Sequence, residues 1–124
     1  KYPCKSDSTS MKKEPRVYLE DIYESIEKIE EYTANASEEA FLSSTEQQDS
    51  VIRRLEIIGE AVKNLPDELR QKYPEIPWKQ VAGMRDILIH EYTSVSIKRV
   101  WSAVKKDLPV LKKIVQTMLT KINN

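Results

Sequence analysis

The sequence is poor in the residues that build disulfides, metal centres and β-sheets. Among 124 residues there is one cysteine, Cys4, so no disulfide can form within the chain and no multi-cysteine metal site is possible. The single histidine, His90, likewise excludes a site built from several histidines. Only two glycines and one phenylalanine occur, whereas Glu, Lys, Leu and Ile are abundant, and this composition favours helix over sheet.

Carboxylates alone can bind magnesium, so a magnesium site built from acidic residues has to be considered separately. Glu56 and Glu60 lie four residues apart and would share one helix face. Two carboxylates without further ligands are usually a solvated or salt-bridged stripe rather than a magnesium site. We therefore expect neither a metal nor any other cofactor.

The chain also lacks a net charge and a long apolar run. Lys and Arg number 20, as do Asp and Glu, so the formal net charge is zero. Bulk charge therefore cannot hold nucleic acid, and RNA would need a local basic patch. No apolar run approaches the roughly 18 residues that span a membrane, and no signal peptide is visible, so the cytoplasm is the expected location.

The first ten residues have no apolar periodicity and directly precede Met11. We expect residues 1–10 to be a leader foreign to the natural chain or a disordered tail, with Met11 as the natural start. Residues 11–124 then form one domain, since this length supports a single core.

Apolar residues recur at helical spacing through most of the domain. Thr45 begins a capping-box pattern for one long helix, and Asp107-Leu108-Pro109 is expected to break or kink the last one. The sequence predicts an all-α fold, an antiparallel bundle of four main helices plus a short C-terminal kinked continuation. The expected helices cover about 16–32, a short stretch near 41–42, about 45–65, 78–91, 97–106, and a last helix from 109 onward.

The most informative stretch runs from residue 83 to residue 92, within the helix expected over 78–91. At about 100° per residue, Arg85 and Tyr92 share one edge of that helix, whereas His90 points away from the core face. Asp86 lies four residues before His90 on the same side, so the two can pair. A lone histidine is more often structural than catalytic, but this one is expected at the surface or in an interface.

Arg85 and His90 project about 140° apart, so they do not meet naturally on their own helix. A cleft between two copies related by a two-fold axis would bring them together. This is our reason to expect a homodimer with a composite site, in which Gly83 would permit close approach near the axis.

An arginine and a histidine suffice in principle to cleave RNA without metal. A neutral imidazole can remove the proton from the 2′-hydroxyl, and a guanidinium stabilises the charge of the phosphorane. An Arg-x4-His spacing alone is weak evidence, because it occurs by chance in many helical proteins. Arg53 and Arg54 could line an RNA path, although solvated charges in intrahelical pairs are the more common role.

The segment from Arg85 to Tyr92 resembles the Arg-x4-His-x-Tyr signature of HepT-like proteins, a branch of the HEPN superfamily. The resemblance extends to residues 51–61, which look like that branch's second helix, and to residues 78–84, which look like the lead-in to its motif. Residues 101–109 resemble its closing segment. The similarity covers essentially Met11 to the C-terminus.

The resemblance implies a dimeric helical bundle that cuts RNA without metal and leaves a 2′,3′-cyclic phosphate. Arg85 and His90 would be the catalytic pair, with Asp86 in a supporting or orienting position. The resemblance also implies the RNase toxin of a type VII-like toxin–antitoxin system. Its antitoxin would be a minimal nucleotidyltransferase that silences the toxin by transferring AMP to Tyr92.

One position departs from the family pattern and keeps a second function open. The residue after the motif arginine is often Asn in active members, but here it is Asp86, a negative charge beside a phosphate site. The alternative is a non-catalytic dimeric module that binds nucleotide or RNA and partners a nucleotidyltransferase.

Overall fold

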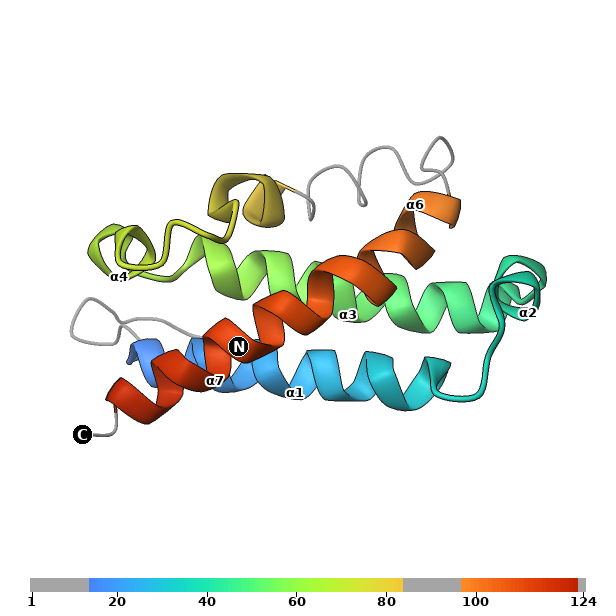
Figure 1. Cartoon of the computed structure of the whole chain (residues 1–124), viewed down its shortest axis with the longest axis horizontal. Coiled ribbons are helices and arrows are strands. Elements are labelled where there is room, and N and C mark those ends of the chain that lie inside the picture. The colour runs from blue at the N-terminus through green and yellow to red at the C-terminus, as the bar shows by residue number, and fades with distance from the viewer. Residues whose placement is uncertain (1–13, 84–96, 123–124) are drawn as a thin grey trace, which may run out of the picture.

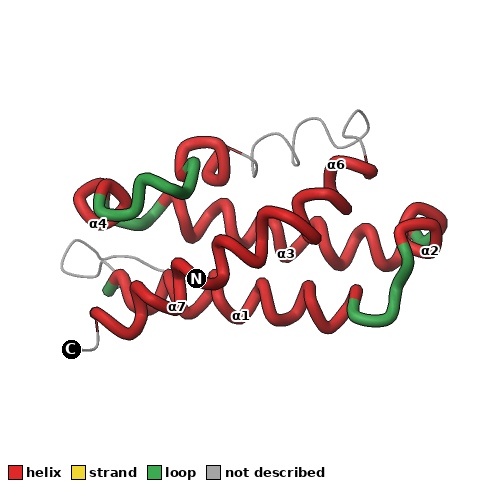
Figure 2. The backbone as a smooth tube through the Cα atoms, in the orientation of Figure 1, coloured by secondary structure: helices red, strands yellow, loops and turns green. Residues whose placement is uncertain are grey.

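The computed structural model describes residues 14–83 and 97–122, and every regular element in these two stretches is a helix (Figure 2). The expected all-α class is therefore confirmed, and the expected leader over residues 1–10 lies outside the described residues. The elements are α1 (Pro15–Thr33), α2 (Glu38–Ser43), α3 (Thr45–Lys63), α4 (Asp67–Gln71), a helical stretch over 78–83, α6 (Ile97–Ser102), the π-helical segment η4 (Ala103–Asp107) and α7 (Leu108–Ile122).

Helices α1 and α3 form an antiparallel pair, and α7 crosses them diagonally (Figure 1). The short helix α2 makes the turn between the pair, and α7 packs directly against α1. The last helix is not the short continuation that the sequence predicted. Its 15 residues make α7 one of the three long helices of the described chain.

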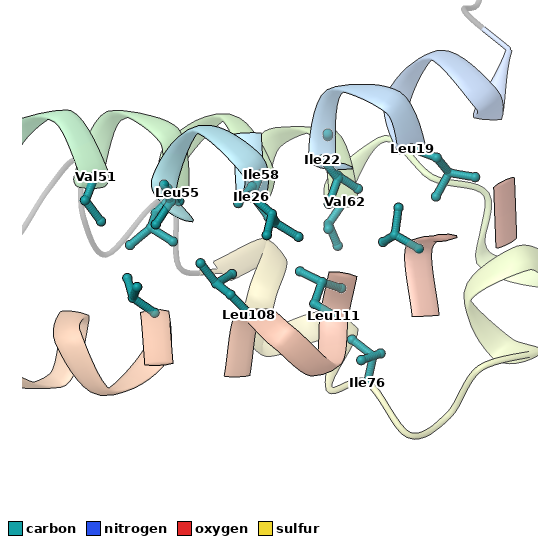
Figure 3. Close-up of a cluster of buried hydrophobic side chains, with 14 of the residues drawn as sticks. Leu19, Ile22, Ile26, Val51, Leu55, Ile58, Val62, Ile76, Leu108 and Leu111 are labelled. Carbon is teal, nitrogen blue, oxygen red and sulfur yellow. The ribbon is translucent and has the colours of Figure 1, made fainter. Parts of the chain in front are cut away.

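The core fills the space between these three helices (Figure 3). Each helix contributes aliphatic side chains three or four residues apart, which is the spacing of one helical face. Ile22, Leu55 and Val115, one from each long helix, are at most 1% exposed. The polar Thr33 is also buried, but its hydroxyl donates to the Ile29 carbonyl oxygen at 2.8 Å, so no polar group is stranded there.

Serine residues begin both helices that follow α1. The Ser37 hydroxyl accepts from the Ala40 backbone N–H, and the Ser44 hydroxyl accepts from the Gln47 N–H, each at 3.1 Å. The prediction that Thr45 caps α3 was wrong by one residue, because Ser44 satisfies the free N–H group and Thr45 is already helical. The Gln47 side chain instead donates to the Tyr32 carbonyl oxygen at 2.7 Å, which fastens the start of α3 to the end of α1.

The break or kink predicted before Pro109 is a π-helical segment within a continuous helix. The Leu108 N–H donates to the Ala103 carbonyl oxygen, five residues back. Pro109 has no N–H, and its ring would clash with the carbonyl of Lys105, four residues earlier, in a regular α-helix. The wider turn relieves this conflict by accommodating one extra residue, so α6 passes into α7 without a break.

None of the helices in the described part of the chain combines the length and the apolar character that a membrane span requires.

Candidate nucleic-acid site

The motif residues lie outside the part of the chain that the structure describes. Arg85, Asp86, His90 and Tyr92 all fall within 84–96, between the two described stretches. Their pairing, and the composite site between two copies, therefore stay predictions. The structure does describe the elements that precede and follow this segment.

Trp78 anchors the helix that leads into the motif segment. Its side chain is 7% exposed, and its indole N–H donates to the Tyr73 carbonyl oxygen at 2.9 Å. The backbone N–H of Trp78 donates to the carbonyl oxygen of Ile76, which is itself buried. The helical stretch 78–83 thus starts where the sequence predicted, from a fixed aromatic side chain, while its predicted end at residue 91 lies outside the described residues.

Aromatic packing also holds the helix that follows the motif segment. Val100 is buried, and the rings of Trp101 and Phe41 lie 5.1 Å apart between centroids, tilted by 37°. The Lys105 ammonium sits 4.7 Å from the centre of the Trp101 ring, a cation–π distance. Trp101 therefore has a packing role and fixes α6 against α2.

Arg53 and Arg54 occupy the middle of α3. The side chain of Arg53 is 72% exposed, and its guanidinium lies 3.7 Å from the Glu56 carboxylate, one turn along the helix. Arg54 is half-buried. The sequence left two roles open for these arginines, pairing within the helix and contact with RNA. The structure shows the pairing for Arg53, and RNA contact by either arginine stays a prediction.

Gly83 ends the first described stretch, directly before the motif segment. A Cβ atom placed on it would meet no atom of the described chain within 4 Å. No packing contact in that part of the monomer thus accounts for a glycine here. Close approach of a second copy stays the proposed reason.

Acidic and basic side chains are segregated between helices, which the zero net charge conceals. Helix α1 carries six acidic residues and two basic ones. The continuous helix 97–122 carries a single acid, Asp107, and seven basic residues: Lys98, Arg99, Lys105, Lys106, Lys112, Lys113 and Lys121. The total charge does not show this pattern, whereas a count of charge for each helix does.

One of these lysines connects the two oppositely charged helices. The Lys112 ammonium on α7 donates to the Glu30 carboxylate on α1 at 2.7 Å, and it lies 5.6 Å from the Tyr23 ring. The hydrogen bond to Glu30 raises the pKa of Lys112 above its ordinary value of 10.5. Lys112 therefore has a carboxylate partner that joins α7 to α1.

Comparison with known proteins gives sequence relatives, whereas no solved structure matches the chain. A Methanocaldococcus jannaschii protein named "Gamma-glutamylcyclotransferase and putative RNase" is 51% identical over 91% of this chain. The chain spans only about half (51%) of that relative's length. A Thermococcus cleftensis protein named "Probable ribonuclease HepT" is also 51% identical, over 82% of this chain and 93% of its own length.

A third relative, a "Putative RNase" of Caldanaerobacter subterraneus, is 46% identical over 88% of this chain and 97% of its own length. The family model described as "Ribonuclease HepT-like" matches residues 22–118. That region runs from the first turns of α1 almost to the end of α7 and includes the whole segment between residues 84 and 96. The chain belongs to the HepT-like ribonuclease family.

Proposed function

We propose that this chain is a metal-independent RNA endonuclease whose reacting groups are Arg85 and His90. One observation carries the proposal: an Arg-x4-His-x-Tyr segment lies inside the region that matches the ribonuclease family. The RNase names of relatives that align over most of their own length support it.

In the proposed reaction the neutral imidazole of His90 takes the proton of a ribose 2′-hydroxyl. The 2′-oxygen then bonds to the adjacent phosphorus as the bond from phosphorus to the 5′-oxygen breaks, and the leaving 5′-oxygen takes up a proton. Arg85 stabilises the negative charge that gathers on the phosphorane oxygens. The products are a 2′,3′-cyclic phosphate and a 5′-hydroxyl end.

We place this reaction in a cleft between two copies of the chain. Arg85 and His90 project about 140° apart on one helix, so a second copy is needed to bring an arginine and a histidine onto one phosphate. In this arrangement Asp86 orients the imidazole of His90. Gly83, which no described side chain packs against, would lie near the two-fold axis.

The proposal extends to a toxin–antitoxin system of type VII-like character. The partner would be a minimal nucleotidyltransferase that transfers AMP from ATP to the phenol oxygen of Tyr92, releasing pyrophosphate. An adenylate there would place a bulky, negatively charged group seven residues from Arg85, on the same edge of the predicted helix. It would compete with the substrate phosphate.

Mass spectrometry tests the modification. Incubation with the cognate nucleotidyltransferase and ATP should add the mass of AMP to the wild-type chain and nothing to Tyr92→Phe. Tyr18→Phe is a suitable control, since this tyrosine lies in α1, far along the chain from the motif. An unchanged addition on Tyr92→Phe would move the modification site elsewhere.

Asp86 favours one competing function, a dimeric module that binds RNA or nucleotide without cutting it. A carboxylate next to a phosphate site repels the substrate, which would slow or abolish turnover. Product analysis separates the two functions: a nuclease releases fragments that end in cyclic phosphate, whereas a module binds labelled RNA stoichiometrically and returns it intact. Cleavage that is lost in Arg85→Ala would assign the reaction to this site.

A further inference from the structure

We propose that the exposed face of the helix 97–122 is a contact surface for the RNA phosphate backbone, with Lys98, Lys106 and Lys113 as its centre. We call these three residues the basic ribbon. This inference rests on the proposed function, because it concerns how the same RNA would be held beyond the reacting groups.

The π-helical segment aligns the ribbon on one face. In a regular α-helix Lys98 and Lys106, eight residues apart, would be rotated from each other by about 80°. One extra residue in the wide turn of η4 makes these eight residues behave as about seven, or two turns. Lys113 follows Lys106 by a further seven residues, so all three share one side of the helix.

The opposite side of the helix is buried. Val100 and Leu108 are also eight residues apart across η4, and each is 5% exposed. Both therefore face the core. The basic ribbon lies on the other side of the helix, and all three of its lysines are exposed.

The ribbon lysines have no carboxylate partner among the described residues, whereas Lys112 pairs with Glu30 and Lys105 covers Trp101. The single acid of the helix, Asp107, is exposed beside Lys106. The ribbon is therefore a row of solvated cations. Phosphates of an RNA strand can bind these cations and replace their counterions.

Phosphates fit this surface better than a protein partner does. Stable protein interfaces centre on apolar and aromatic side chains and are depleted of lysine. The large hydrophobic side chains most exposed in the described chain are Val110, at 51%, and Ile122, at 38%. Both lie on this helix, but they are twelve residues apart and form no continuous apolar patch. By contrast, helix α1 exposes Glu20, Glu24, Glu27 and Glu31 and would repel RNA.

The ribbon also begins near the motif along the chain. Lys98 follows His90 by eight residues, so covalent geometry limits the distance between their Cα atoms to about 28 Å. A strand held at the reacting groups can thus reach α6 within a few nucleotides. We infer that the ribbon extends the RNA path away from the site of cleavage.

The test measures binding separately from cleavage. The probe is a fluorescent 2′-O-methyl oligoribonucleotide, which lacks the 2′-hydroxyl that the proposed reaction needs and stays intact. The ribbon variant is Lys98→Gln/Lys106→Gln/Lys113→Gln. The control is Lys63→Gln/Lys72→Gln/Lys79→Gln, three exposed lysines outside this helix, which changes the net charge equally.

The ribbon variant should bind on the order of tenfold or more weakly at low salt, and the slope of log affinity against log salt should fall by roughly 2. The control should bind like the wild type, and circular dichroism should show that both variants fold. Equal weakening of both variants would mean that only net charge matters, and it would overturn the inference. Unchanged binding of the ribbon variant would also overturn it and would leave an acidic protein as the occupant.

Failure of the proposed function has a different signature. If ordinary RNA stays intact with the wild-type protein while the ribbon variant loses binding to the probe, the ribbon stands and the nuclease does not. If RNA is cut but the ribbon variant binds normally, the nuclease stands and the ribbon does not.

Discussion

At the scale of single residues, helix starts show how much the sequence determines and where it becomes ambiguous. A start near residue 45 was predicted from a polar cluster, and α3 does begin at Thr45. The cluster holds adjacent hydroxyls at positions 44 and 45, and either can cap a helix. Only the backbone geometry decides, since Ser44 is extended and Thr45 helical.

Substitution of the two hydroxyl residues checks this assignment. Ser44→Ala should lower the free energy of unfolding by about 1 kcal/mol, because the Gln47 N–H loses its acceptor. Thr45→Ala, the matched control one residue later, should change it by less than about 0.5 kcal/mol, as surface substitutions usually do. Urea unfolding of both variants measures the difference. A larger loss for Thr45→Ala would restore the original assignment of the cap.

At the scale of elements, the sequence predicted helix positions well but not how they join. The apolar spacing gave α1 within a residue at each end. At Pro109 it predicted a break or a kink, and the structure has neither a loop nor a regular α-helix there, because a widened turn accommodates the proline. The buried residues at 100, 104, 108 and 111 do not reveal the wide turn, because their steps of four, four and three average about 3.7 residues per turn, which also fits a regular α-helix.

Deletion of one residue tests the wide turn. Removing Lys105 together with Pro109→Ala should leave a regular α-helix with both faces in register, so stability should stay within about 2 kcal/mol of the wild type. Removing Lys113 with Pro109→Ala should cost more, because Gln116 would then occupy the core position of Val115. Thermal and urea unfolding compare the two variants. Equal losses would show that η4 does not hold an extra residue.

The contact between α1 and α7 should make stability depend on alkaline pH. Glu30 raises the pKa of Lys112 in the folded chain above the unfolded value of 10.5, so the folded state retains this proton longer. The resulting stabilisation is fully present below pH 10.5 and is lost as the pH rises through the folded pKa. It should be less than about 1 kcal/mol, as for other solvent-accessible pairs.

The signal is the difference in stability between variants, which removes any pH effect that they share. Glu30→Gln should be slightly less stable than the wild type at neutral pH, and the gap should close above the lysine pKa. Glu27→Gln, one turn earlier in α1, serves as the control and should show a smaller gap. Urea unfolding across this pH range measures it. A Glu30→Gln gap that persists unchanged at high pH would contradict the role of the pair.

At the scale of the whole molecule, the sequence predicted the family and the all-α class but not the distribution of charge. The family and the helices follow from local patterns, and both are confirmed. The separation of acidic α1 from the basic helix 97–122 emerges only when charges are counted helix by helix. The composite site is harder still to predict from the sequence, because it requires a second copy of the chain.

The central claim is tested most directly by incubating purified protein with bulk RNA in EDTA, wild type beside His90→Ala. We predict that wild type cuts the RNA to fragments ending in 2′,3′-cyclic phosphate. His90→Ala, still folded by circular dichroism, should be slower by about 10²- to 10⁴-fold, as expected for loss of a general base. Cleavage at the wild-type rate by His90→Ala would contradict the mechanism. Intact RNA with unmodified wild-type protein would contradict the proposed nuclease and favour the binding module.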